Sequence, residues 1–424
     1  MIYELYDIYQ AGHPVTTDSR RVAPGDLFFA LKGGNFDGNA YAGLALDAGA
    51  VCAVVDDPQV AVDERYMVVP DVLKALQGMA RLHRRSLEIP VLAITGSNGK
   101  TTTKELVSRV LAKRFQVSTT RGNLNNHIGV PLTLLSIEPG TEFAVIEMGA
   151  NHLGEIASYC TIAEPDYGLI TNIGKAHLEG FGSEVGIRRG KGELFEYLAR
   201  TGGTAFYSAE SEDLQQMAGD LPSLSAYAFS AEALEVLPEK DNLLTLDYGK
   251  TRIRTQLVGD YNKYNVAAAL AIGEYFEVDP AAAVEAIESY APDNNRSQRI
   301  ETARNIVYLD AYNANPSSMS AALDNFRTIS DPEREKVLIL GDMRELGNYA
   351  AQEHRSLLDR IENSGIEKVY LAGPLFEKVN ENRFKAFPDT KTLSEYLAEH
   401  PVDKSIILVK GSRGIGLEIL LPLL

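Results

Sequence analysis

The sequence predicts an α/β protein with mainly parallel sheets, divided into about three domains. The chain has 424 residues, and a typical length of roughly 150 residues per domain suggests this number. Apolar residues make up 45% of the chain and charged residues 23%, which is enough for each domain to bury an ordinary core. Short β-branched runs alternate with helix-period stretches, and this alternation is typical of parallel sheets with helices on their faces.

The strands are predicted where β-branched and apolar residues cluster between turn signals. Helical stretches follow most of them, such as residues 102–113 and 317–329, while residues 205–260 are predicted to form strands and turns. Ligands of parallel sheets bind at the carboxyl ends of the strands, so functional residues are expected directly after them. The predicted strands are residues 91–95, 143–147, 168–171, 307–310, 337–340, 369–371 and 406–409.

The chain is expected to divide at two positions. A helical stretch ends at Glu88-Ile89-Pro90, and the turn-rich residues 291–295 follow the helical segment 281–289. These breaks predict a small N-terminal α/β domain (1–88), a central domain (89–292) and a C-terminal domain (293–424).

Composition excludes several classes of protein. The net charge of −17 at pH 7 argues against a nucleic-acid partner, which needs a basic surface. The N-terminus lacks the basic and apolar regions of a signal peptide, and no apolar run approaches the roughly 18 residues of a membrane span. Cys52 and Cys160 have no metal-ligand spacing and are expected to be reduced thiols. We therefore expect a cytoplasmic protein that does not span a membrane.

The strongest functional motif follows the predicted strand 91–95. Residues 95–102 read Thr-Gly-Ser-Asn-Gly-Lys-Thr-Thr and open a helix, which is the setting of a phosphate-binding loop. The glycines let backbone N–H groups approach phosphate oxygens, Lys100 can reach the β- and γ-phosphates, and the Thr101 hydroxyl can ligate Mg²⁺. The general motif has four residues between its first glycine and the Gly-Lys pair, whereas this loop has two. Nucleotide binding is still favoured over an ordinary glycine-rich turn, because strand, glycines, lysine and threonines occur together.

Polar residues also follow other predicted strands. Glu147 could hold Mg²⁺ near the phosphates, and His177 lies in a polar, glycine-rich loop. Lys191 follows in an Arg-Arg-Gly-Lys-Gly-Glu segment. Taken singly, each of the three could be a surface or structural residue. The C-terminal strands are followed by polar segments that could also be simple turns, at residues 310–316, 341–347 and 410–413.

Together these segments resemble the Mur ligase family over nearly the whole chain. The family has the shortened phosphate loop seen here, and its other signatures are matched at residues 122–126, 147–152, 172–182 and 312–316. Residues 18–31 and 34–38 are similar to the region that holds the UDP part of the sugar nucleotide in relatives, and residues 261–265 to an adenine-contacting turn. Two positions depart from the family pattern: Tyr261 replaces a common His, and Asn295 replaces the Gly before Arg296.

The resemblance implies an ATP-dependent amide ligase of peptidoglycan precursor synthesis, with a central P-loop ATPase-like parallel sheet and a Rossmann-like C-terminal domain. Residues 312–316 are most similar to the branch of the family that adds D-alanyl-D-alanine to UDP-N-acetylmuramoyl-tripeptide. ATP would phosphorylate the tripeptide carboxylate, and the dipeptide amine would attack the resulting acyl phosphate. ATP and Mg²⁺ are the implied cofactors, and we expect a monomer.

The same resemblance assigns roles to individual residues. Thr101 and Glu147 would hold one Mg²⁺, and His177 and Lys191 would help to hold a second, with the lysine as a carbamate because an ammonium cannot ligate a cation. The implied catalytic residues are Lys100, Asn126, His177 and Lys191, with Asn126 orienting the acceptor carboxylate. The implied nucleotide contacts are Gly96, Ser97, Asn98, Gly99, Lys100, Thr101, Thr102, Asn265, Arg296 and Asp310. The implied substrate contacts are Ser19, Arg20, Phe28, Asp37, Asn313, Asn315, Lys410 and Arg413. Because several cations lie in the C-terminal domain, the domains are expected to close around the substrate and exclude water.

Three alternatives remain at the level of sequence. A sister Mur ligase would add a single amino acid, a folylpolyglutamate synthase would share the ATPase core, and a regulatory module would bind nucleotide without ligation. The chain lacks the Asp-Asn-Pro-Arg motif of the diaminopimelate-adding sister. The UDP-type N-terminal region argues against the folate ligase. The joint presence of the phosphate-loop lysine and the implied metal ligands argues against the regulatory module.

Overall fold

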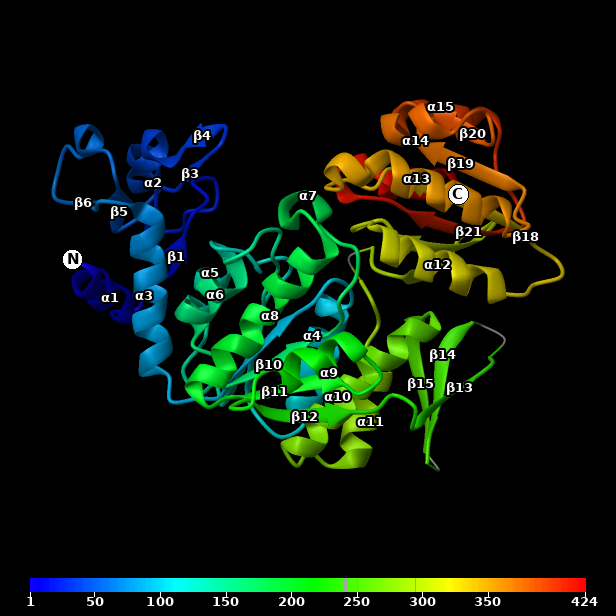
Figure 1. The fold of residues 1–424 in the computed structure, drawn as a ribbon. Helices are drawn as coiled ribbons and strands as arrows, with labels where there is room; N and C mark the ends of the chain where they lie inside the picture. Colours follow the sequence, from blue (N-terminus) through cyan, green and yellow to red (C-terminus); the bar gives the residue numbers. More distant parts are fainter. Residues whose placement is uncertain (240–241, 250, 294) are drawn as a thin grey trace.

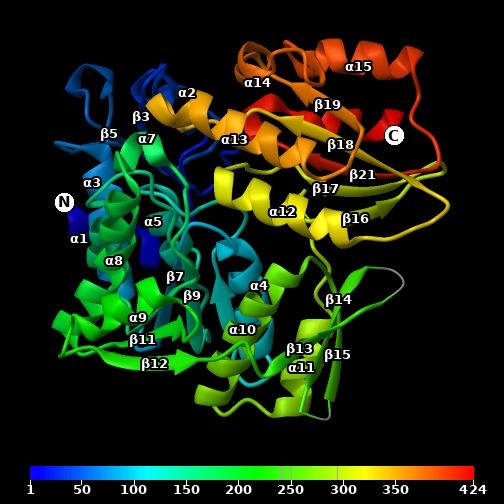
Figure 2. The ribbon, with the colours of Figure 1, turned by 45° about the vertical axis from the view of Figure 1, so that its right-hand side comes forward.

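The computed structural model describes residues 1–239, 242–249, 251–293 and 295–424, and it arranges them around three parallel or mainly parallel sheets. Residue 294, inside the second predicted boundary, lies outside the described residues. Figures 1 and 2 show the N-terminal part in blue on one side of the central part and the C-terminal part in yellow to red on the other. The predicted α/β class is confirmed.

The N-terminal part is built on a short parallel sheet in the order β1-β2-β5-β6. Phe28 at the middle of β2 packs among small apolar residues such as Ala45 and Ala53, which lets helix α2 lie close to the sheet. The strands are β1 (Val15–Thr16), β2 (Leu27–Phe29), β5 (Cys52–Val55) and β6 (Tyr66–Val68), with a two-stranded ribbon of β3 (Lys32–Gly33) and β4 (Phe36–Asp37). The helices are α1 (Ile2–Gln10) and α2 (Ala42–Asp47), with 3₁₀ turns η1 (Gly38–Tyr41) and η2 (Pro58–Val60).

Helix α3 (Val72–Ser86) joins this part to the centre of the molecule. Asp71 caps its first turn by accepting a hydrogen bond from the Lys74 N–H at 2.9 Å. Helix α3 packs against α1 and also against α5 (Gly129–Leu135) and α6 (Glu155–Ala163) of the central part. Near its end Arg84, 8% exposed, donates to the Ala163 carbonyl at 2.8 Å and pairs with Asp166 at 2.9 Å. The helix therefore holds both parts by apolar packing and by a nearly buried guanidinium.

The central part contains a six-stranded, fully parallel sheet in the order β12-β11-β10-β7-β9-β8. Its middle strands are buried on both faces: Leu92 and Ile94 pack on the side of α4 and α10, while Val91 and Ala93 pack on the side of α5, α6 and α8. The strands are β7 (Val91–Thr95), β8 (Val117–Thr119), β9 (Phe143–Glu147), β10 (Tyr167–Ile170), β11 (Thr204–Ser208) and β12 (Ser225–Phe229). The helices are α4 (Lys100–Leu111), α5 (Gly129–Leu135), α6 (Glu155–Ala163), α7 (Leu178–Phe181), α8 (Glu184–Thr201), α9 (Glu212–Gly219), α10 (Lys263–Tyr275) and α11 (Pro280–Glu288).

A three-stranded antiparallel sheet follows, consisting of β13 (Leu234–Leu237), β14 (Leu243–Tyr248) and β15 (Thr251–Val258). The prediction of strands and turns for 205–260 is confirmed, although helix α9 also lies within it. The 3₁₀ turn η3 (Asp260–Asn262) then leads into α10.

The C-terminal part is a six-stranded sheet in the order β16-β17-β21-β18-β19-β20, parallel except at the edge strand β16. The strands are β16 (Gln298–Glu301), β17 (Ile306–Asp310), β18 (Glu335–Gly341), β19 (Lys368–Ala372), β20 (Lys385–Phe387) and β21 (Ser405–Lys410). The helices are α12 (Pro316–Thr328), α13 (Ala350–Glu362), α14 (Pro374–Val379) and α15 (Thr390–Glu399), with 3₁₀ turns η4 (Gly347–Tyr349), η5 (Arg413–Ile415) and η6 (Leu417–Leu423).

All seven predicted strands are present, with ends that differ by at most two residues. The other strands outside residues 204–260 have only two to four residues, which is too short for a clear periodic pattern. In the described part of the chain no helix combines the length and the apolar character that a membrane crossing requires.

Candidate active site

The carboxyl ends of β7, β9 and β10 open onto a cavity of about 720 Å³. The start of α4 lines one side, and the opposite wall includes Asp310 and Lys410, which end β17 and β21 of the C-terminal sheet, with Tyr312 and Asn313 after β17. A volume of this size is typical of small-molecule sites. The cavity therefore lies where the topology of a parallel sheet places ligands, between two such sheets.

The loop from Gly96 to Gly99 makes a tight turn that only glycine allows at both positions. Gly96 has φ +142° and Gly99 has φ +78°, both in the region that L side chains rarely adopt. A Cβ atom at Gly96 would lie 2.0 Å from Thr171 Oγ1, and one at Gly99 would lie 2.7 Å from Asn265 Oδ1. The Asn98 carbonyl accepts hydrogen bonds from Thr171 Oγ1 at 2.7 Å and Asn172 Nδ2 at 3.0 Å. The loop is thus held rigidly at the N-terminus of α4, where backbone N–H groups favour anions.

Lys100 begins helix α4 and folds back over this loop. Its Nζ donates to the Gly96 carbonyl at 2.7 Å and to the Ser97 carbonyl at 3.1 Å. Burial lowers the pKa of Lys100 to about 8, with Glu147 opposing this effect and Arg296 adding to it. A phosphate in the loop would offer this ammonium a stronger partner than two carbonyls.

Glu147 ends β9 and carries a carboxylate that is only half satisfied. The residue is 1% exposed, and its Oε1 accepts hydrogen bonds from Asn125 Nδ2 at 2.7 Å and Thr101 Oγ1 at 3.2 Å. Its Oε2 is buried and has no hydrogen-bond partner. A buried carboxylate oxygen without a partner is costly, and a hard cation satisfies it well. Thr101 and Glu147 therefore fit a magnesium ion beside the phosphate loop.

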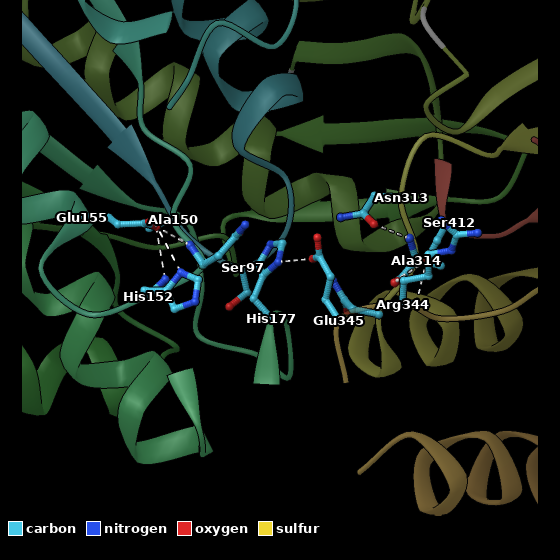
Figure 3. Close-up of polar contacts among 12 residues, drawn as sticks. Ser97, Ala150, His152, Glu155, His177, Asn313, Ala314, Arg344, Glu345 and Ser412 are labelled. Carbon is cyan, nitrogen blue, oxygen red and sulfur yellow. Dashed lines mark hydrogen bonds and ion pairs between the residues drawn. The ribbon is translucent and has the colours of Figure 1, made fainter. Parts of the chain in front are cut away.

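His177 and Lys191 each have a hydrogen-bond partner of their own. His177 Nδ1 donates a hydrogen bond to Glu345 Oε2 of the C-terminal part, and this contact lowers the pKa of Glu345 (Figure 3). Lys191 is 0% exposed, and its Nζ donates to the Ala150 carbonyl at 3.0 Å and lies 5.1 Å from the centre of the Phe181 ring. Burial, and then the charge of Lys100, lower the pKa of Lys191 well below its ordinary range. Lys191 does not line the cavity, whereas the Ala150 that it contacts does.

The resemblance implies two magnesium sites, with Thr101 and Glu147 at one and His177 and Lys191 at the other. In the structure Thr101 and Glu147 are joined by a hydrogen bond, whereas the His177 imidazole is bonded to Glu345 and the Lys191 ammonium to the Ala150 carbonyl. Within the described ranges, no cluster of three or more His, Cys, Asp or Glu residues could hold a metal.

Two predicted asparagines lie in the cavity wall with their side chains already engaged. Asn126 is exposed, and its Oδ1 caps α5 by accepting from the Gly129 N–H at 2.9 Å. Asn265 is 8% exposed, accepts from Thr103 Oγ1 at 2.9 Å and donates to Asn262 Oδ1 at 2.7 Å. Asn265 thus holds α10 against α4 directly behind Gly99.

The C-terminal wall carries a buried ion pair. Lys410, 2% exposed, lies 2.5 Å from Asp310 Oδ2 and 3.3 Å from the Asn313 carbonyl oxygen. The other oxygen of Asp310 accepts from the Ser297 N–H at 3.2 Å. The lysine that was predicted to contact substrate is therefore already paired within its own sheet.

Cations and an aromatic ring stack beside this pair. The Arg296 guanidinium lies 3.6 Å from the centre of the Tyr312 ring, and the guanidinium of the exposed Arg413 lies 5.4 Å from it. Arg296 and Tyr312 line the cavity, while Arg413 does not.

Direct contacts join the two walls. Asn315 Nδ2 donates to Asn98 Oδ1 of the phosphate loop at 2.7 Å, and the Lys175 N–H donates to Ser317 Oγ at 2.9 Å. The Lys175 ammonium also pairs with Glu353 at 3.0 Å. The C-terminal domain is therefore docked on the nucleotide side of the central domain.

Comparison with known proteins shows which family has this sequence and fold. Family models match the chain in three stretches: "Mur ligase family, catalytic domain" at residues 12–84, "Mur ligase middle domain" at 94–273 and "Mur ligase, glutamate ligase domain" at 295–413. The chain is 33% identical to the UDP-N-acetylmuramoyl-tripeptide–D-alanyl-D-alanine ligase of Bacillus subtilis, over 96% of this chain and 92% of that protein. The enzyme of the same name from Escherichia coli is also 33% identical, over 95% and 92%. The chain belongs to the Mur ligase family.

Solved structures of Mur ligases have the same architecture. A crystal structure of MurF from Acinetobacter baumannii superposes with a TM-score of 0.86 at 30% identity, covering 96% of this chain and 92% of that one. MurF ligase from Thermotoga maritima in complex with ADP gives a TM-score of 0.85 at 26% identity, covering 98% and 97%. A folylpolyglutamate synthase from Mycobacterium tuberculosis gives 0.64 at 16% identity over 83% of this chain and 94% of that one, a likeness of fold alone.

The predicted substrate residues of the N-terminal domain lie outside the cavity of this Mur ligase. Arg20 forms two hydrogen bonds of 2.8 Å to Asp18, and its side chain is 86% exposed. Ser19 is half-buried, and the largely exposed Asp37 accepts from the Asn39 N–H at 2.9 Å. Phe28 is 1% exposed inside the domain core, so its side chain is a packing residue and does not reach a surface ligand.

Sequence reasoning missed several residues of this Mur ligase site. Asn125 holds Glu147, Asn172 supports the phosphate loop and Glu345 holds His177. Each lies in one of the predicted polar segments, at 122–126, 172–182 and 341–347, but its role depends on a partner far away in sequence. Ser208 and Glu210 also line the cavity, after a strand that carries no motif.

Proposed function

We propose that this Mur ligase uses ATP to join D-alanyl-D-alanine to UDP-N-acetylmuramoyl-tripeptide in peptidoglycan precursor synthesis. The observation that carries the proposal is the similarity to ligases of that name, at 33% identity over more than nine-tenths of both chains. The phosphate loop, the half-satisfied Glu147 carboxylate and the second wall of cations support the same chemistry. We further propose that the enzyme works as a monomer in the cytoplasm, with domains at 1–88, 89–292 and 293–424.

In the first half-reaction, a carboxylate oxygen of the tripeptide attacks the γ-phosphorus of ATP, and ADP leaves. Backbone N–H groups of residues 96–102 bind the phosphates, and Lys100 moves from the loop carbonyls to a phosphate oxygen. Thr101 and Glu147 would hold Mg²⁺, which would neutralise phosphate charge. Catalysis here is mainly positioning and charge neutralisation.

In the second half-reaction, the dipeptide amine attacks the acyl carbon, loses a proton, and phosphate leaves as the amide forms. The wall that carries Arg296 and the Asp310–Lys410 pair closes the cavity from the C-terminal side. Excluding water there protects the acyl phosphate from hydrolysis. Contacts across the cavity, such as Asn315 to Asn98, support a closed arrangement during this step.

The remaining predicted residues keep proposed roles. Asn265, Asp310 and Arg296 would contact the nucleotide, and Asn126 would orient the acceptor carboxylate through the part of its amide that does not cap α5. Ser19, Arg20 and Asp37 would bind the UDP group, with Phe28 shaping that region from the core. Amine-side contacts would come from Asn313, Asn315, Lys410 and Arg413.

Lys191 would act as a carbamate formed with CO₂. A carbamate forms from the neutral amine, and burial shifts Lys191 toward that form. The amine nitrogen bonds to the carbon of CO₂ and loses one N–H proton to water, and the resulting anion could help to hold a second cation together with His177.

The amine specificity tests this proposal. We expect kcat/KM to be highest for D-alanyl-D-alanine and very low for D-alanine, which carries the same amine and methyl group. One methyl group is worth only about 1–3 kcal/mol, so the discrimination must come from polar contacts to the peptide bond and distal carboxylate. The measurement is steady-state ADP release with D-alanyl-D-alanine, D-alanine, L-lysine and meso-diaminopimelate, each with its matching UDP-muramyl acceptor. A single amino acid as the better amine would make the protein a sister ligase instead.

A further inference from the structure

We propose that Glu345 is a positioning residue, contributed by the C-terminal domain, that fixes the tautomer of His177. In this role the Glu345 carboxylate keeps the proton on Nδ1 of the imidazole. The lone pair of the neutral ring is then on Nε2, which can use it toward groups in the cavity. The proposal rests on the proposed function in one respect, because it assumes that His177 takes part in the ligase reaction.

The contact itself determines which nitrogen carries the proton. His177 Nδ1 is hydrogen-bonded to Glu345 Oε2, and an ionised carboxylate can only accept, so Nδ1 donates. In a neutral imidazole the other nitrogen then has the lone pair. Among the described residues no hydrogen-bond partner of Nε2 is found, and His177 belongs to the cavity lining. Histidines that bind cations are commonly held at their second nitrogen by a carboxylate in this way.

The backbone on both sides of the contact is held in an unusual conformation. His177 has φ +56° and Glu345 has φ +62°, in a region that residues other than glycine rarely adopt. The Glu179 N–H donates to the Glu345 carbonyl at 3.1 Å, and the Arg344 N–H donates to Ser412 Oγ at 2.9 Å. These backbone hydrogen bonds hold the segments on both sides of the contact, and Figure 3 shows the His177 and Glu345 side chains pointing toward one another.

The contact also links the histidine to docking of the domains. His177 follows β10 of the central sheet, and Glu345 follows β18 of the C-terminal sheet. The hydrogen bond exists only while these domains are docked, so separation of the domains frees the imidazole to exchange tautomers. The nearby Gly347 packs at 3.3 Å from the Glu179 side chain, measured from the position that a Cβ would take, so the docking surface is close-fitting here.

The tautomer can be measured directly in the full-length protein without nucleotide. Long-range ¹H–¹⁵N correlation of ¹⁵N-histidine-labelled protein at pH 8.5, with His177 assigned through His177→Gln, reports which ring nitrogen carries the proton. We expect a proton on Nδ1 in the unmodified protein, and a mixture or a proton on Nε2 in both Glu345→Gln and Glu345→Ala. A proton on Nε2 in the unmodified protein, or the same tautomer in all three proteins, would overturn the proposal.

Kinetics test whether the tautomer matters for the reaction. We expect Glu345→Gln to lower kcat about 10- to 100-fold, with KM for ATP and for the amine little changed. Tyr349→Phe is the matched control, because its hydroxyl donates to the Gly182 carbonyl at 3.3 Å from the same segment but outside the cavity. This control should keep both kcat and the His177 tautomer. An unchanged kcat in Glu345→Gln would overturn the proposal. Failure of the unmodified protein to ligate any amine would instead overturn the proposed function.

Discussion

Two regions differ in how their polar residues are held. One is the cavity wall of the central sheet, and the other is the predicted UDP region of the N-terminal domain. In the central wall, Lys100 donates to the Ser97 carbonyl and Glu147 accepts from Asn125, and both partners line the cavity. In the N-terminal region, Arg20 bonds to the nearby Asp18, and its side chain is 86% exposed. The central wall is preorganised before any ligand arrives, whereas the N-terminal region can gain its order from the ligand. Binding energy is expected to serve catalysis in the first region and affinity in the second.

In the N-terminal domain, we expect Phe28→Ala to change the free energy of unfolding strongly and Arg20→Ala to change mainly substrate binding. Phe28→Ala should lower the free energy of unfolding by about 3–5 kcal/mol, because it opens a cavity in a core with 1% exposure. Arg20→Ala should change the stability by less than about 0.5 kcal/mol, because the side chain is exposed. It should instead raise KM for the UDP substrate about 10-fold.

Urea unfolding and steady-state kinetics measure both variants of the N-terminal domain. If Phe28→Ala kept its stability but lost affinity for the UDP substrate, Phe28 would be a binding residue like Arg20, and the distinction between packing and binding residues in this domain would be wrong.

In the central wall, Lys100→Ala should lower kcat/KM about 10²- to 10³-fold while leaving the fold intact. The truncation removes a charge from the start of a helix that faces a cavity, so little packing is lost. Lys113→Ala is the control, because this lysine lies just beyond the other end of the same helix in a surface pair with Glu285 at 2.9 Å. ADP release should be normal in the control. A Lys100→Ala enzyme with near-normal ADP release would remove the phosphate-loop assignment.

Lys191 differs from the residues of the central wall, because it is buried and does not itself line the cavity. Lys191→Ala should lower kcat about 10- to 100-fold, and a small added carboxylate should restore part of the activity by taking the place of the carbamate. Lys104→Ala is a matched control, since Lys104 is equally buried and donates to the Thr120 carbonyl at 2.6 Å. Carboxylate should not rescue the control. Mass spectrometry that found only an unmodified Lys191 in the active enzyme would contradict the carbamate.

The smallest expected effect is a proton taken up with ATP. Because burial lowers the pKa of Lys100 to about 8, more than half of this side chain is neutral at pH 8.5 in the free protein. Phosphates in the loop favour the charged form and raise the pKa, so binding at pH 8.5 should take up a fraction of a proton, at most the neutral fraction of Lys100, and binding at pH 6.5 should take up almost none. Calorimetry in two buffers of different ionisation enthalpy measures this uptake. In Lys100→Arg the guanidinium stays charged, so uptake that persisted there would come from another group.

The α/β class, the seven strands and the position of the phosphate loop could all be predicted from the amino-acid sequence. These follow from local signals: apolar runs that suit strands buried on both faces, and glycines at Gly96 and Gly99 where a turn must bring backbone N–H groups to a ligand. The rule that ligands lie at the carboxyl ends of parallel strands then indicated which segments would meet. It placed Glu147, His177 and Asp310 correctly on one cavity.

Which side chains pair within that cavity could be seen from the fold alone and not from the sequence. Glu147 meets Asn125, His177 meets Glu345 at a distance of 168 residues in sequence, and Phe28 turns into the core. Periodicity places a residue on a face or at a strand end, but the partner is set by how two sheets dock and by which rotamers the packed surroundings allow. For this reason the residue types at the site follow from the sequence, while the hydrogen bonds that tune them follow from the fold.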